Sequence, residues 1–147
     1  MDSVALGRFV LPAMEKLSER LPHLCCASLC TADGFNVCSI GITEQQLGKM
    51  AALSGSLLTL GEAMLNNLSA STPGPVLDIM TLEAGTWIIV AVRVAAPGQP
   101  LVLTLSATQT PLGVLHLRAR QTAEEISSLL GYTSPAKPPQ TQGDILS

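Results

Sequence analysis

Residues 86–95 read Thr-Trp-Ile-Ile-Val-Ala-Val-Arg-Val-Ala, and this stretch is the strongest indication of fold class in the chain. β-branched and aromatic residues dominate it, which is typical of a strand in the centre of a sheet. Apolar runs lie on either side, at Val76–Leu82 and Leu101–Ala107, and are set apart by Gly85 and by Pro97-Gly98. Because glycine and proline favour turns, the sequence predicts three consecutive strands joined by short turns.

A further pair of strands is predicted nearer the N-terminus. Leu24–Cys30 is a short apolar run suited to a strand that is buried on both faces. Asp33-Gly34 follows it, and this dipeptide is a strong hairpin signal because both residues tolerate positive φ. We therefore expect Phe35–Ile42 to return as the second strand of a hairpin.

Helices are predicted before, between and after these strands. Apolar residues recur at helical spacing from Leu6 to Leu21, with Pro12 inside, where a proline should kink or restart a helix. A second helix should begin at Thr43, which forms a capping box with Gln46, and end near Leu68.

The last helix is expected to be capped by Thr110, with Pro111 at its first position, and to stop at Gly131. The order is then helix, two strands, helix, three strands, helix. A five-stranded, mainly antiparallel sheet with helices on both faces, an α/β (α+β) architecture, would bury every apolar stripe. We expect one domain over residues 1–131 and a Pro-rich, disordered tail over residues 132–147.

The composition points to protein partners. Charged residues make up 13% of the chain, about half the globular average, so part of the surface should be covered by another polypeptide. The net charge is −3, the basic residues are scattered and aromatic residues reach only 3%, which disfavours nucleic acid. No basic leader or apolar run of about 18 residues occurs, so we expect a cytoplasmic protein without membrane insertion.

No catalytic constellation is recognisable in the sequence. His23 lies close to Cys25, and His116 falls in the last helix, but nothing marks a third group that would orient either histidine. No phosphate-binding or metalloprotease motif occurs. We expect no catalytic residues and no cofactor.

The cysteines are also weak metal candidates. Cys26 and Cys30, with Cys38 and His23, could be stretched into a zinc site, but a flat sheet does not form the tight knuckle that tetrahedral ligands need. Free cysteines in a reducing compartment are most often small buried hydrophobic residues. We therefore assign no metal ligands, although the sequence leaves any redox or metal role of these thiols open.

The order of elements and several local stretches resemble the Roadblock (dynein light-chain) family of regulatory domains. The matching stretches are Leu21–Leu29, Ala32–Phe35, Leu57–Glu62, Gly85 between two apolar strands, and Thr110-Pro111. The resemblance covers roughly residues 10 to 131. It implies a profilin-like fold. It also implies that the chain acts as a scaffold or regulator of small GTPases, or as a motor-associated light chain, and not as a nucleotide hydrolase.

The resemblance also implies a homodimer, in which the third strands pair edge to edge and the second helices pack across a two-fold axis. Carried over, this places Val76–Leu82 and the helix from Glu44 to Leu68 at the interface. The second helix carries a line of small residues that could form such a face: Gly48, Ala52, Gly55, Thr59 and Ala63. Tight packing against the domain's own sheet would explain the same line.

The strand Val76–Leu82 is apolar on both faces, with Val76, Met80 and Leu82 on one side and Leu77 and Ile79 on the other. Such a strand is either covered by helices or continued by a neighbour's sheet, since an unprotected apolar edge invites aggregation. Asp78 belongs to this candidate interface and could equally be a charge that blocks the edge.

The sequence therefore predicts a non-catalytic, dimeric regulatory or scaffold module that binds a protein partner, a small GTPase or a larger assembly. The alternative is a small-molecule or metal sensor domain, since related α/β folds often hold ligands between sheet and helix. The identity of the partner and the surface that meets it are not readable from these residues.

Overall fold

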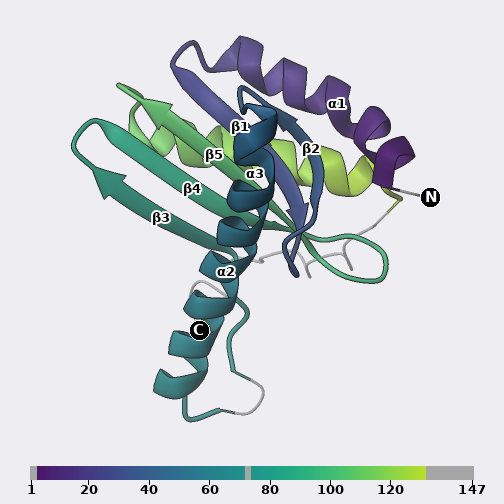
Figure 1. Cartoon of the computed structure of the whole chain (residues 1–147). Coiled ribbons are helices and arrows are strands. Elements are labelled where there is room, and N and C mark those ends of the chain that lie inside the picture. The colour runs from purple at the N-terminus through teal and green to yellow at the C-terminus, as the bar shows by residue number, and fades with distance from the viewer. Residues whose placement is uncertain (1–2, 72–73, 132–147) are drawn as a thin grey trace, which may run out of the picture.

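The structure, a computed structural model, describes residues 3–71 and 74–131 (Figure 1). The sequence of elements agrees with the predicted order: α1 (Ser3–Arg20), β1 (Leu24–Thr31), β2 (Asn36–Ile40), α2 (Glu44–Leu68), β3 (Ile79–Ala84), β4 (Trp87–Val94), β5 (Leu101–Thr108) and α3 (Leu112–Leu129). The predicted tail at residues 132–147 lies outside the described residues. Among the described helices, none has the length and apolar character needed to cross a membrane.

The five strands form one sheet in the order β2-β1-β5-β4-β3, and every neighbouring pair is antiparallel. The strands predicted from β-branched content, β4 and β5, lie inside the sheet, while β2 and β3 form its two edges. In Figure 1, α2 crosses one face of the sheet and α1 and α3 cover the other. The predicted architecture, with helices on both faces, is confirmed.

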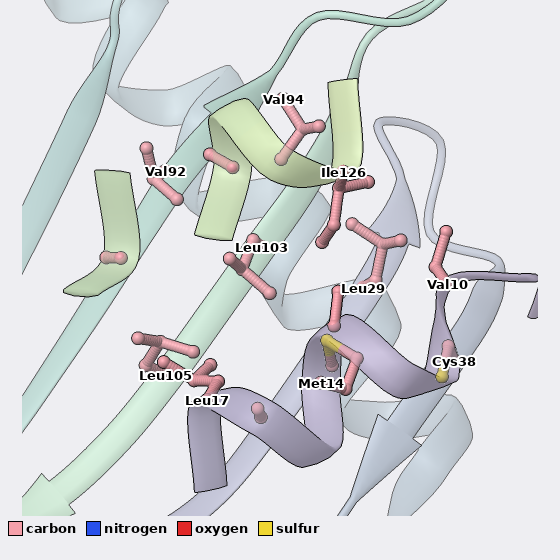
Figure 2. Packing of buried hydrophobic residues seen from close by; sticks show 14 of the residues in the cluster. Val10, Met14, Leu17, Leu29, Cys38, Val92, Val94, Leu103, Leu105 and Ile126 are labelled. Carbon is pink, nitrogen blue, oxygen red and sulfur yellow. The ribbon is translucent and has the colours of Figure 1, made fainter. Parts of the chain in front are cut away.

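The larger core lies between the sheet and the pair α1 and α3 (Figure 2). Alternate residues of the central strands point into it, as the period of two in a strand requires. Its largest fully buried side chains come from both helices and three strands: Val10, Met14, Leu17, Leu29, Val90, Val94, Leu103, Leu105, Leu115 and Ile126. A smaller core lies beneath α2 and contains Cys30, Ala51, Leu58, Ala91 and Val102. The sheet face under α2 is therefore held by fewer apolar contacts.

The helices agree with the predictions only in part. Helix α1 runs from Ser3 to Arg20 without restarting at Pro12, whose side chain is exposed. The Gln46 side chain accepts a hydrogen bond from the Thr43 N–H at 3.4 Å, so the predicted capping box at α2 is confirmed. At α3, however, Pro111 is the N-cap, because the Thr110 hydroxyl donates to the Thr108 carbonyl at 2.8 Å and caps nothing.

The third strand is shorter at its start than predicted. It begins at Ile79 rather than Val76 and continues to Ala84. Leu77 and Ile79 were expected on the same side of the strand, but Leu77 precedes the strand and they lie on opposite faces of the sheet. Leu77 packs against Gly61 on the α2 face, whereas Ile79 packs into the core beneath α3. A run of apolar residues alone did not show where strand pairing begins.

Candidate interaction surface

Helix α2 packs on the sheet through a narrow inner face. Ala51, Ser54, Gly55, Leu58 and Gly61 are its buried residues. The packing is reinforced at β4, the strand next to the β3 edge, where the Arg93 guanidinium donates to the Glu62 carboxylate at 2.7 Å. Two flanks of the helix are left beside this inner face, and they differ in character.

One flank, called here the apolar flank, consists of Leu53, Leu57, Leu60 and Met64. The exposed fraction is 60% for Leu53, 56% for Leu60 and 55% for Met64, while Leu57 is half-buried. Isolated exposed leucines are ordinary, but a row of them along one side of a helix is a candidate surface for binding another molecule.

The apolar flank borders a groove of about 400 Å³, called here the α2 groove. Its floor is the sheet, and the lining residues are Met50, Leu53, Ser54, Ser56, Leu57, Leu60, Leu82, Ile89 and Thr104. Leu82 of β3 is itself 41% exposed, so the apolar surface continues from the helix onto the edge strand.

The outer edge of β3 is open within the described part of the chain, where β4 is its one pairing partner. The Arg93 N–H donates to the Asp78 carbonyl at 2.8 Å, and Met80 and Leu82 stand opposite Ala91 and Ile89 in the same register. Since backbone groups alternate along an antiparallel strand, those of Ile79, Thr81 and Glu83 point away from the sheet. They offer donors and acceptors to another strand.

The predicted strip of small residues lies on the opposite flank of α2, beside the turn between β1 and β2. Gly48, Ala52, Thr59 and Ala63 are exposed there. Gly55 is buried, and a Cβ atom on it would lie 2.6 Å from the Ala32 carbonyl oxygen. The alternative interpretation, tight packing inside the subunit, therefore accounts for Gly55.

The predicted residues of the third strand fall into two groups. Met80 and Leu82 lie in β3 on the α2 face, half-buried and exposed respectively. Val76, which is 61% exposed, and Asp78 precede the strand, so neither contributes its side chain to the edge itself.

Sequence reasoning did not single out Leu53 and Leu60, which do not belong to the predicted strip of small residues on the second helix. Their signal was nevertheless present. Leucines at helical positions outside the inner stripe have no place in the subunit's own core, so they indicate a second apolar face.

The thiols and histidines do not converge on a reactive site. All four cysteines are free, and the Cys25 thiol donates to the backbone carbonyl oxygen of His23 at 3.8 Å. His116 Nε2 is 2.8 Å from the Thr81 hydroxyl. Burial raises the pKa of the Cys30 thiol to about 11, which keeps it protonated. Among the described residues no three His, Cys, Asp or Glu side chains are grouped to hold a metal.

Comparison with solved structures identifies the fold of this chain. No protein-family model matches the sequence, and no curated protein does. Solved structures do match. A Roadblock/LC7 domain from Streptomyces avermitilis superposes with a TM-score of 0.70 at 21% identity, covering 81% of this chain and 95% of the other.

Two MglB structures are similar to the chain at the same TM-score of 0.70. The gliding protein MglB from Thermus thermophilus is 14% identical and covers 86% of this chain and 92% of its own. An MglB with a tetrameric arrangement is 16% identical and covers 86% and 91% respectively. The chain therefore has the Roadblock/LC7 fold, as its sequence pattern led us to expect.

Proposed function

We propose that this protein is a non-catalytic regulatory or scaffold module that forms a homodimer and binds a protein partner, a small GTPase or a larger assembly. The observation that carries the proposal is the coincidence of the apolar flank of α2 with the open edge of β3 on one side of the molecule. The similar structures support the self-association in this proposal. One is the gliding protein MglB, and another is an MglB with a tetrameric arrangement. The four free thiols are in keeping with a cytoplasmic location.

In the proposed dimer, the β3 strands of two copies pair antiparallel across a two-fold axis. The outward backbone groups of Ile79, Thr81 and Glu83 supply the hydrogen bonds, and the sheet continues into the second copy. This pairing brings the second copy's α2 toward the α2 groove, so Leu53, Leu60 and Leu82 lose contact with water. Apolar burial stabilises the association, while the backbone pairing sets its geometry.

The dimer is tested by light scattering coupled to gel filtration at micromolar concentration. Leu53→Glu places a charge on the apolar flank and should convert the dimer to a monomer. Leu117→Glu is the matched control, because Leu117 is 52% exposed on α3, on the other face of the sheet, and its replacement should leave the dimer intact.

Ala52→Glu tests the small-residue strip in the same experiment, since Ala52 neighbours Leu53 in sequence but lies on the other flank. Dimer loss with Leu53→Glu alone supports the apolar flank, and loss with Ala52→Glu alone supports the strip predicted from the sequence. A wild-type chain that stays monomeric throughout would refute self-association.

The GTPase partner is tested separately. Purified small GTPases of the source organism, loaded with GDP or with a non-hydrolysable GTP analogue, are titrated with the protein in a calorimeter. We expect saturable binding that differs between the two nucleotide states, because a regulator must distinguish them. Absence of binding in both states would remove the GTPase from the proposal without affecting the dimer.

A further inference from the structure

Three hydroxyl groups beneath α2 are buried without a hydrogen-bond partner in the described structure. They belong to Ser28, Ser54 and Thr104, whose exposed fractions are 1%, 1% and 2%. Buried hydroxyls are normally paired, because leaving one unpaired costs about 1–3 kcal/mol. Three buried hydroxyls without a partner in the protein can therefore accept a hydrogen bond from, or donate one to, a polar group from outside the chain.

Two of these hydroxyls belong to residues that line the α2 groove, and the third belongs to the strand neighbour of one of them. Ser28 of β1 and Thr104 of β5 are directly paired in register, and Thr104 and Ser54 both line the groove. Their neighbours in this small core offer little, since Ala91 and Val102 are apolar. The Cys30 thiol donates to the Ala51 carbonyl at 3.7 Å. Ser54 lies close enough to Cys30 to lower the pKa of the thiol, against the larger effect of burial, but the Ser54 hydroxyl forms no hydrogen bond of good geometry.

The remaining walls of the groove are almost entirely apolar. Leu53, Leu57, Leu60, Leu82 and Ile89 supply them, and no charged side chain is among the lining residues that the structure describes. An apolar groove of about 400 Å³ whose lining includes only three polar residues, Ser54, Ser56 and Thr104, has the size and composition of a small-molecule site.

We propose that the α2 groove binds a small neutral amphiphile. Its apolar part lies against the apolar flank and Leu82. Its single uncharged hydrogen-bonding group, a hydroxyl or amide, pairs with the Thr104 and Ser54 hydroxyls, whose buried oxygens turn toward the groove when it binds. A charged head group is disfavoured because burying it with no counter-charge is costly. The proposal goes beyond the regulatory function above and does not depend on it.

The site nevertheless shares its leucines with the proposed dimer. A ligand that occupies the groove removes surface that a second copy would cover, so ligand binding and self-association are thermodynamically linked. The binding test therefore includes the Glu83→Pro variant, which keeps every groove residue but removes an outward backbone donor from β3.

The test titrates the full chain with 1-octanol, following backbone amide resonances by NMR. We expect saturable shifts that centre on Leu53, Leu82 and Thr104, in both wild type and Glu83→Pro. Thr104→Val removes the hydroxyl at almost constant shape and should weaken 1-octanol binding about tenfold, the effect of one hydrogen bond. Thr59→Val is the matched control, because Thr59 lies on the opposite flank of α2, outside the groove, and its hydroxyl donates to the Gly55 carbonyl at 3.0 Å.

The free Thr104→Val protein should melt no lower than wild type, which shows that its fold survives. Octanoate should bind more weakly than 1-octanol. No saturable binding in either wild type or Glu83→Pro would overturn the proposal and leave the hydroxyls to ordered water. Equal affinity of Thr104→Val and wild type, or tighter binding of octanoate, would overturn it as well. A failed dimer with intact 1-octanol binding would refute only the proposed function.

Discussion

Gly48 and Gly55 lie two turns apart on α2, and their surroundings call for opposite responses to substitution. A Cβ atom on Gly48 meets nothing within 4 Å, so Gly48→Ala should stabilise the protein by about 0.5–1 kcal/mol through better helix propensity. A Cβ atom on Gly55 meets the Ala32 carbonyl oxygen at 2.6 Å, so Gly55→Ala should destabilise it despite the same propensity gain. Urea unfolding of the two variants measures both signs, and a stabilised Gly55→Ala would show that the helix is not held against the β1–β2 turn.

Cys30 makes a prediction about alkaline pH. Its thiol pKa rises from 9.0 to about 11 because the side chain is buried, so the folded state favours the protonated form. This contribution is complete below pH 9 and is lost as the pH rises from 9 toward 11, by on the order of 2 kcal/mol. Other groups titrate in the same range, so the quantity to measure is the free energy of unfolding of wild type relative to Cys30→Ala, which should fall over that interval. A constant difference would contradict the assignment.

At the scale of the element, the ion pair between Arg93 and Glu62 joins α2 to β4 where the small core is thin. Both side chains are about one-third exposed, so water and salt screen the pair and its contribution is modest. Glu62→Gln should cost about 0.5–1 kcal/mol at low ionic strength, and the difference from wild type should shrink in high salt. A salt-independent loss would indicate packing rather than charge.

Element types were predictable from local chemistry, whereas several boundaries were not. The β-branched run at Trp87–Val94 and the capping box at Thr43 carry their signals within a few residues, and both were confirmed. The start of β3 depends on where Arg93 of β4 finds its partner, a tertiary contact that no apolar pattern contains. Thr110 had an alternative acceptor in the Thr108 carbonyl, so its capping role was lost to a local turn.

The candidate surface was harder to predict for a related reason. Small residues on α2 suggested close approach of a second backbone, and for Gly55 the approach is real, but the backbone is that of the β1–β2 turn in the same subunit. Which flank of a helix is left uncovered depends on the path of the helix across the sheet. Only with that path known do Leu53 and Leu60 stand out as unburied.

At the scale of the whole molecule, the open edge of β3 and the apolar flank make separable contributions to the proposed dimer. Glu83→Pro removes one outward backbone N–H while the bonds from Met80 and Leu82 to β4 are kept, so the fold should persist and the dimer should weaken at least several-fold. Glu83→Ala removes the same side chain but keeps the N–H, so its dimer should match wild type. Analytical ultracentrifugation gives the dissociation constants of both variants. If Glu83→Ala weakened the dimer as much as Glu83→Pro, the Glu83 side chain rather than strand pairing would hold the copies together, and the continuous sheet would have to be abandoned in favour of helix contacts alone.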